Sequence, residues 1–210
     1  MSETESETRV VIVVDDDPMV RRALDSLFRS IGLTTALYDS ATAFLAVDAP
    51  TANSCIVTDV RMPGLSGLDF QKVLAARGVT TPVILITGHG DVPMSVRAMK
   101  AGAVDFLTKP FRDQDLIDAV NEALERDRRA RRRAGDAAAA KARYDLLTPR
   151  ERQVMEHVVA GLMNKQTAAE LGLSEITVKL HRSSLMRKME VHTVADLVRL
   201  SQDLKSQAQA

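Results

Sequence analysis

Acidic side chains and one lysine follow strand-forming runs of the sequence, and together they could bind a divalent cation. Asp15, Asp16 and Asp17 follow one such run, Asp59 follows a second and Lys109 follows a third. Carboxylates that converge stay ionised together only when a cation joins them, and oxygen ligands without histidine or cysteine select a hard ion such as Mg²⁺. We therefore expect a magnesium site, with the alternative that each aspartate only caps the helix that follows it.

The elements that must position these residues are predicted from short β-branched runs and from apolar residues at helical spacing. The predicted strands are Arg9–Val14, Thr34–Leu37, Ser54–Thr58, Pro82–Thr87 and Val104–Thr108. The predicted helices between them cover residues 18–31, 40–46, 66–77 and 92–100, and a fifth begins near residue 113. Strands that alternate with helices indicate an α/β doubly wound, five-stranded parallel sheet, whose site lies at the carboxyl ends of the strands.

The composition is typical of a globular protein with a buried core, because 45% of the 210 residues are apolar and 27% are charged. The longest apolar runs are far shorter than the roughly 20 residues of a membrane span, and no basic and apolar leader begins the chain. We therefore expect no membrane association and a cytoplasmic location. The one cysteine, Cys55, lies in an apolar run, which excludes a disulfide framework and a cysteine zinc site.

Charge is distributed unevenly along the chain, although its formal sum is zero. Residues 1–126 carry 12 basic and 18 acidic side chains, residues 127–143 carry 7 and 2, and residues 144–210 carry 9 and 8. We predict a disordered tail over 1–8, an acidic domain over 9–126, a basic and partly helical linker over 127–143 and a second domain over 144–210. The arginine run 128–133 is either a solvated helix face or a surface that attracts DNA phosphates or the acidic domain.

The second domain shows only helical patterns, at residues 148–160, 164–171, 174–190 and 193–203. Thr148, Pro149 and Glu151 form a strong helix-start signature. An apolar stripe on the last helix suits either the domain core or a dimer seam, and it consists of Val194, Leu197, Val198 and Ser201. Single-stranded nucleic acids stack on aromatic side chains, and five phenylalanines, two tyrosines and no tryptophan favour duplex binding instead.

Three motifs of the first domain resemble the signatures of response-regulator receiver domains, and the resemblance covers residues 9–126. The motifs are Val13–Pro18, Thr58–Gly67 and Asp105–Pro110. The stretches Ile86–Met94 and Ala98–Asp105 are most similar to the FixJ/NodW branch of that family. The resemblance implies a flavodoxin-like receiver that accepts a phosphoryl group on an aspartate from a sensor histidine kinase.

The resemblance identifies Asp59 as the phosphoacceptor and implies the ligands of the metal. Mg²⁺, or Mn²⁺ in its place, would be held by Asp16, Asp59 and the backbone carbonyl of Arg61, with Asp15 acting through water. The ion would offset charge during in-line phosphoryl transfer.

The resemblance also implies which residues respond to the phosphoryl group. Lys109 and Thr87 would contact its oxygens, and Phe106 would rotate inward into the space that Thr87 vacates. Arg61 and His89 would tune the attack of water on the acyl phosphate, although His89 could equally be an ordinary loop histidine. The Lys109–Pro110 peptide is expected to be cis.

Motifs of the second domain resemble a LuxR/FixJ-type helix-turn-helix over about residues 145–205. They are Leu147–Glu151, Asn164-Lys165, Ala168–Leu171 and Ser174–Arg182. On a helical wheel one side should face the domain core, and its residues are Val178, His181, Leu185 and Met189. The opposite side should enter the major groove of duplex DNA, and its residues are Ile176, Lys179, Leu180, Ser183 and Arg187.

Individual DNA contacts follow from side-chain chemistry. Lys179 and Ser183 would donate to base edges, and Leu180 would contact a thymine methyl group. Arg182 and Lys188 flank the core-facing side, so phosphate contact or packing of their stems is expected. The further expected phosphate contacts are Thr177, Asn164 and Lys165. The alternative is a helical bundle with a solvated charged face, because this domain has only a small excess of basic residues.

The expected function is that of a response regulator in a two-component system, not of an enzyme beyond its own phosphotransfer and slow dephosphorylation. Phosphorylation of Asp59 would produce a homodimer that binds promoter DNA and, with RNA polymerase, regulates and more often activates transcription. Three alternatives remain open at this point. They are a DNA-binding regulator whose receiver no longer takes phosphate, a receiver that acts only through protein contacts, and a magnesium-dependent phosphohydrolase, in which Arg61 stands where a second carboxylate is usual.

Overall fold

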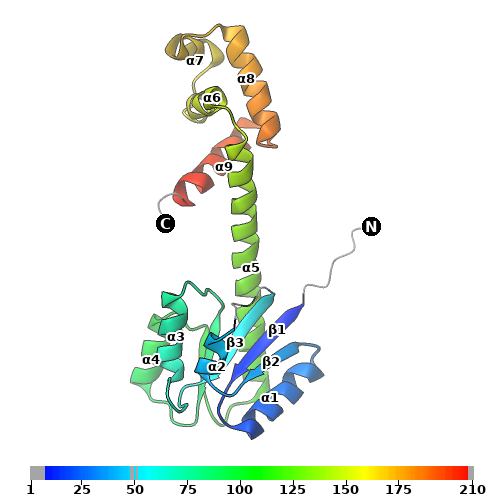
Figure 1. The fold of residues 1–210 in the computed structure, drawn as a ribbon, viewed down its shortest axis with the longest axis vertical. Helices are drawn as coiled ribbons and strands as arrows, with labels where there is room; N and C mark the ends of the chain where they lie inside the picture. Colours follow the sequence, from blue (N-terminus) through cyan, green and yellow to red (C-terminus); the bar gives the residue numbers. More distant parts are fainter. Residues whose placement is uncertain (1–7, 48–49, 51, 208–210) are drawn as a thin grey trace. The chain divides into compact units, whose positions relative to one another are not determined.

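The computed structural model describes residues 8–47, 50 and 52–207, and Figure 1 shows the order of the elements along the chain. Two compact units are present, of which the first ends at Arg131 and the second begins at Arg132. The predicted tail over 1–8 lies outside the described residues except for Thr8. In the described part, no helix combines the length and apolar character that a bilayer span requires.

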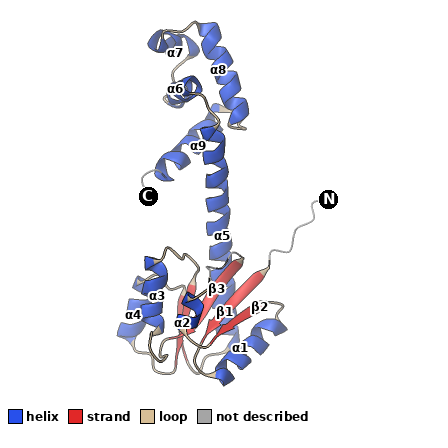
Figure 2. Ribbon diagram, viewed as in Figure 1, coloured by secondary structure: helices blue, strands red, loops and turns tan. Residues whose placement is uncertain are grey.

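The first unit is built on a five-stranded parallel sheet in the order β2-β1-β3-β4-β5, drawn in red in Figure 2. Its strands are β1 (Arg9–Val14), β2 (Thr34–Tyr38), β3 (Asn53–Asp59), β4 (Val83–Thr87) and β5 (Asp105–Thr108). Its helices are α1 (Pro18–Ser30), α2 (Ala41–Leu45), α3 (Gly67–Ala76), α4 (Val92–Lys100) and the first part of α5 (Asp113–Asp145), whose last part belongs to the second unit. The predicted α/β doubly wound fold is confirmed, with strand and helix boundaries close to those expected.

Helices cover both faces of this sheet. Successive residues of a strand point to opposite faces, so Val11 of β1 belongs to one core and Ile12 to the other. The first core includes Phe28 of α1 and Leu116 of α5, and the second includes Phe70 of α3. Every residue of β3 and of β4 is buried, as expected for central strands of a covered parallel sheet.

The predicted basic linker lies within α5, and its first residues are tied to the first unit. The carboxylate of Asp127 is 2% exposed, accepts a hydrogen bond from the Ser54 amide at 3.0 Å and pairs with Arg131 at 2.6 Å. The Arg131 guanidinium also donates to the carbonyl oxygen of Pro50 at 2.9 Å. Contacts of the first unit therefore extend past Arg126, where the charge pattern placed the start of a linker.

Most of the arginine run has acidic neighbours on its own helix. Arg128 and Arg129 pair with Glu125 at 2.8 and 2.7 Å, and Arg132 lies 4.0 Å from Asp136. These pairs at helical spacing favour the solvated helix face for Arg128, Arg129 and Arg132, whereas Arg131 binds the first unit.

The second unit contains four further helices: α6 (Pro149–Val159), α7 (Asn164–Leu171), α8 (Glu175–Lys188) and α9 (Val194–Gln207). Thr148 and Glu151 form the expected capping box at the start of α6. The side chains of Leu197 and Ser201 on α9 are 0% and 7% exposed, and Leu197 belongs to the core of the unit. In the stripe on the last helix, Leu197 therefore packs into the domain core and Val194 packs against it, whereas Val198 is half-buried outside this core.

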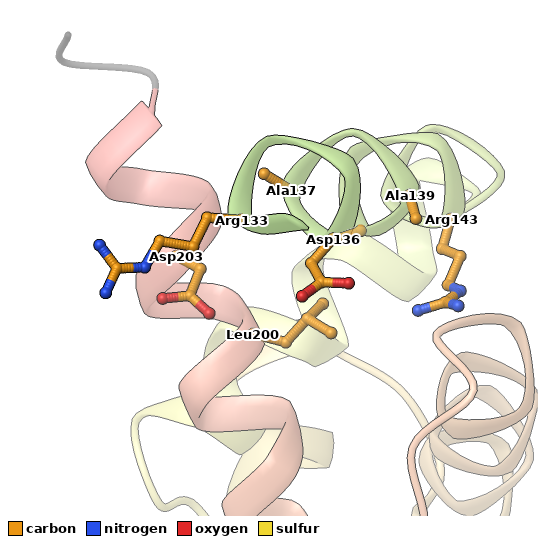
Figure 3. Close-up of a pocket in the computed structure, with 8 residues that line it drawn as sticks. Arg133, Asp136, Ala137, Ala139, Arg143, Leu200 and Asp203 are labelled. Carbon is orange, nitrogen blue, oxygen red and sulfur yellow. The ribbon is translucent and has the colours of Figure 1, made fainter. Parts of the chain in front are cut away.

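A groove of about 510 Å³ lies within the second unit, between the end of α5 and α9. Figure 3 shows alanine side chains of α5 and Leu200 of α9 among charged residues of both signs, namely Arg133, Asp136, Arg143 and Asp203. None of the lining residues is a histidine or a cysteine. None of the residues predicted to take part in phosphoryl transfer lines this groove, since they lie at the sheet of the first unit.

Candidate functional sites

Three of the predicted chemical residues meet at the carboxyl edge of the sheet. Asp15 directly follows β1, Asp59 ends β3 and Lys109 directly follows β5. The Nζ atom of Lys109 lies 3.2 Å from Oδ2 of Asp15 and 2.9 Å from Oδ1 of Asp59. The two carboxylates are 2% and 7% exposed. The strand order reverses between β1 and β3, so this cluster occupies the crevice in which doubly wound sheets bind ligands.

The electrostatics of this cluster favour a further cation. Burial raises the pKa of the Asp15 carboxyl, and the Asp17 amide and the Lys109 ammonium oppose this only in part. Burial also disfavours the charge on Lys109, but its hydrogen bond to Asp59 and the charges of Asp15 and Asp59 raise the pKa of Lys109 overall. Two carboxylates that share one ammonium leave surplus negative charge in a partly desolvated place.

The donor chemistry of the cluster fits Mg²⁺, but the predicted ligands are not all gathered. Carboxylate and carbonyl oxygens are the ligands that a hard divalent ion prefers, and both buried carboxylates are within reach of one ammonium. Asp16 is exposed, and in the described part of the chain no three acidic, histidine or cysteine side chains are arranged to hold a metal ion. The structure thus brings Asp15 and Asp59 together, without Asp16.

The loop after β1 is held in place by α1. Asp17 caps this helix, because its carboxylate accepts a hydrogen bond from the Met19 amide at 2.7 Å, so the capping interpretation is correct for this residue. The guanidinium of Arg21 donates to the carbonyl oxygens of Asp15 at 2.6 Å and Asp16 at 2.9 Å. Arg21 is a positioning residue that the sequence interpretation missed, and its place one turn after the cap was the available signal.

The predicted switch residues Thr87 and Phe106 both pack against the loop that follows β4. Thr87 is fully buried, and its hydroxyl accepts a hydrogen bond from the His89 amide at 3.2 Å. A Cβ placed on Gly90 would lie 3.0 Å from a ring carbon of Phe106, 3.2 Å from the Thr87 methyl and 2.6 Å from the Thr108 methyl. Only a glycine at position 90 lets this loop approach Thr87 and Phe106 so closely.

A second close approach supports the backbone of Asp59 itself. A Cβ on Gly67, the first residue of α3, would lie 2.3 Å from the carbonyl oxygen of Asp59. The Gly67 amide donates to the Val60 carbonyl at 3.0 Å, and Oδ2 of Asp59 accepts from the Arg61 amide at 2.6 Å. The side chains of Arg61 and His89 are exposed, and the Lys109–Pro110 peptide is cis as expected.

The second unit presents α8 as the helical wheel predicts. Val178, Leu185 and Met189 are fully buried in the core of the unit, and His181 is half-buried. The opposite face is solvent-exposed, and it consists of Ile176, Lys179, Leu180, Ser183 and Arg187. Ser174 caps the helix by accepting a hydrogen bond from the Thr177 amide at 3.1 Å. An exposed face with two cations and two large apolar side chains is suited to a DNA groove.

Most of the other residues that were expected to contact DNA are hydrogen-bonded within the unit. Arg182 donates to the Asn164 side chain at 3.0 Å, so these two hold α8 and α7 together. The Thr177 hydroxyl is hydrogen-bonded to that of Ser174 at 2.7 Å, whereas Lys165 is exposed on α7.

Two family models match the chain, the response regulator receiver domain over residues 11–121 and the bacterial regulatory proteins of the luxR family over residues 145–201. The chain is 54% identical to nodulation protein W of Bradyrhizobium diazoefficiens over 202 residues, which cover 96% of this chain and 89% of that protein. The chain belongs to the response regulators.

This response regulator is also 47% identical to the transcriptional regulatory protein FixJ of Azorhizobium caulinodans, over 93% of this chain and 92% of that protein. Among solved structures, the response regulator StyR matches with a TM-score of 0.85 at 44% identity, covering 93% of this chain and 98% of StyR. Full-length FixJ of B. japonicum matches with a TM-score of 0.55 at 40% identity, covering 94% of this chain and 97% of that one. The chain combines a receiver domain with a LuxR-type DNA-binding domain, and the relatives that share this architecture are transcription regulators of two-component systems.

In the second unit of this response regulator, the side chain of Lys188 is hydrogen-bonded to other residues of the unit. Its ammonium is 2.7 Å from Oε2 of Glu151 and 3.2 Å from the Leu146 carbonyl oxygen. Burial alone would raise the pKa of Glu151, but hydrogen bonds from Lys188, Ser184 and Thr148 lower it to about 2. Glu151 was predicted only as part of a capping box, and its link to a lysine 37 positions later has no signal in local sequence.

Proposed function

We propose that Asp59 is the phosphoacceptor of this response regulator, that a sensor histidine kinase is the phosphodonor, and that the modification controls binding of the second unit to promoter DNA. The observation that carries the proposal is the contact of Lys109 with both Asp59 and Asp15 at the strand-order reversal. A carboxylate and an ammonium that share a crevice provide a nucleophile and a charge for phosphoryl oxygens.

In the chemical step, an oxygen of Asp59 attacks phosphorus and forms an acyl phosphate, while the bond from phosphorus to the kinase histidine breaks. Lys109 offsets the charge of the phosphoryl oxygens, and Arg21 holds the backbone of the acidic loop. When bound, Mg²⁺ or Mn²⁺ would neutralise charge in the transfer. Asp59 and the Arg61 carbonyl would hold it, together with Asp16 once the Asp16 side chain turns inward. Asp15 would act through water.

The acyl phosphate carries about −1.5 to −2 charge in place of the single charge of the Asp59 carboxylate. The buried Thr87 ends the neighbouring strand β4. We assign the response to Thr87 and Phe106, which meet across Gly90, and the rate of hydrolysis to the exposed side chains of Arg61 and His89. The readout surface is then α4, which begins directly after this loop, and β5, which carries Phe106.

On DNA, α8 occupies the major groove, with Lys179 and Ser183 as base donors and Arg187 at the far end of the exposed face. Two chains on a two-fold symmetric site would bind as one unit, because the second helix meets its half-site at high effective concentration. We place the receiver at 9–126, a linker at 127–143 whose first residues are bound to the receiver, and the DNA-binding domain at 144–210. The chain is then a cytoplasmic regulator that acts with RNA polymerase.

The test measures both phosphoryl labelling and the molecular mass of the protein in solution. The full chain in Mg²⁺ should incorporate phosphate from a small phosphodonor and double its light-scattering mass with beryllofluoride, whereas Asp59→Asn should do neither. Labelling of Asp59→Asn at the wild-type rate would refute the phosphoacceptor assignment. An unchanged mass of the wild type would refute dimerisation driven by phosphorylation. Release of phosphate from a generic phosphomonoester would instead support a phosphohydrolase.

A further inference from the structure

The apolar side chain of Ile176, at the start of α8, is largely exposed among the described residues of its unit. Ile176 is 75% exposed, and Leu180, one turn later on the same face, is 67% exposed. The core-facing side of the helix is already filled, because Val178 and Leu185 are fully buried. Neither Ile176 nor Leu180 therefore contributes to the core of the unit.

The position of Ile176 on the helix is well determined by local interactions. Ser174 caps the helix through the Thr177 amide at 3.1 Å, which orders the turn that contains Ile176. A β-branched side chain in a helix has one strongly preferred χ1 rotamer, so Ile176 loses little rotational freedom when it binds. Residues at the amino-terminal end of a recognition helix are those that reach base edges.

We infer that Ile176 is a specificity-determining residue that contacts a thymine methyl group in the major groove, next to the thymine contact of Leu180. The inference rests on the proposed docking of α8 in that groove. Aliphatic side chains offer no hydrogen bond, and the one apolar group that a base pair displays in the major groove is the thymine C5-methyl. Lys179 is exposed between the two and supplies the attraction to DNA.

The spacing of the two side chains limits the sequence that they can recognise. Four residues of helix advance by about 6 Å, and base pairs are stacked about 3.4 Å apart. Ile176 and Leu180 can therefore contact thymines about two base-pair steps apart, on either strand. The bound half-site should contain two thymines at this separation.

The test uses thymine replacement, since deoxyuridine differs from thymidine only by the methyl group. Duplexes are first selected from a random library with the full chain in Mg²⁺ and beryllofluoride. Each thymine of the selected site is then replaced in turn by deoxyuridine, and the dissociation constant is measured for the wild type, Ile176→Ala and Ile176→Val. Leu146→Ala is the matched control, because Leu146 is 67% exposed in the same unit but lies outside α8.

We expect one thymine of the site to be contacted by Ile176 alone. Replacement of this thymine by deoxyuridine should weaken DNA binding by the wild type about fourfold, which is the effect of one buried methyl group. Binding by Ile176→Ala should be unchanged. Ile176→Val should retain the discrimination, and Leu146→Ala should match the wild type at every position. If deoxyuridine replacement weakened binding of Ile176→Ala as much as binding of the wild type at every thymine, the inference would be overturned while DNA binding stayed intact. Failure to select any sequence would overturn the docking of α8, and the inference with it.

Discussion

The ammonium of Lys109 contacts the carboxylate of Asp59 at 2.9 Å although their strands are not neighbours in the sheet. Lys109 follows β5 and Asp59 ends β3, so the lysine side chain reaches across the end of β4. A flexible four-carbon stem allows this reach and places a compact charge at its tip. The contact joins the ends of β5 and β3 at the site.

Removal of this charge should slow phosphoryl transfer. Lys109→Gln keeps a polar side chain but leaves Asp15 and Asp59 without their shared cation. We expect labelling by a small phosphodonor to slow about a hundredfold, as for the loss of one preorganised electrostatic contact. Lys72→Gln is the control, since Lys72 pairs with the exposed Asp69. Equal rates for the two variants would contradict a role for Lys109 in the transfer.

Gly90 and Gly88 lie in the same loop and should differ sharply when changed to alanine. A Cβ at position 90 meets Thr108, Phe106 and Thr87 at 3.2 Å or less, whereas nothing lies within 4 Å of one at position 88. Gly90→Ala should destabilise the first unit by about 1–3 kcal/mol, and Gly88→Ala by less than about 0.5 kcal/mol. Calorimetric melting of the full chain measures both. Equal stability of the two variants would show that the loop relaxes freely.

The pair of Glu151 and Lys188 should make the second unit sensitive to acid. The pKa of Glu151 is about 2 in the fold, below its usual 4.5, so its stabilisation is present above pH 4.5 and is lost as the pH falls towards 2. Glu151→Gln should remove this part of the acid transition and cost about 1.5–3 kcal/mol at neutral pH. Circular dichroism at a series of pH values checks both effects, with the exposed Glu156→Gln as control. An unshifted acid transition in Glu151→Gln would exclude the pair as its cause.

Two exposed lysines of the second unit should act differently on DNA. Lys179→Ala should weaken binding to the selected site by about 1–3 kcal/mol more than binding to random duplex. Lys165→Ala should weaken both equally and reduce the salt slope by about one. Titrations at several salt concentrations separate these effects. Equal losses on both duplexes for Lys179→Ala would count against base recognition.

Features set by short-range periodicity could be predicted from the sequence. β1 spans Arg9–Val14 as expected, and the two faces of α8 separate at the expected residues, because alternation and helical spacing report burial directly. The meeting of Asp15, Asp59 and Lys109 followed from a topological rule, since the carboxyl ends of parallel strands share one edge.

Features set by long-range pairing could not be predicted. Asp127 occurs in a stretch dominated by arginine, which is typical of a solvated surface, yet its carboxylate is buried against the amide of Ser54, 73 positions earlier. Lys188 stands beside DNA-facing residues in the sequence but is directed at Glu151. Charge type alone does not distinguish a solvated ion from a buried partner, because the difference depends on which backbone or carboxylate lies opposite.

The close approach of Gly67 to Asp59 also restricts how this fold can diverge during evolution. Every residue other than glycine carries a Cβ, and at position 67 that atom would lie 2.3 Å from a backbone oxygen. No substitution there is neutral unless α3 moves first, although Gly67 takes no part in phosphoryl chemistry. A lineage that abandoned the phosphoacceptor could replace Asp59 freely, yet it would keep this glycine for as long as α3 followed β3 at the same distance.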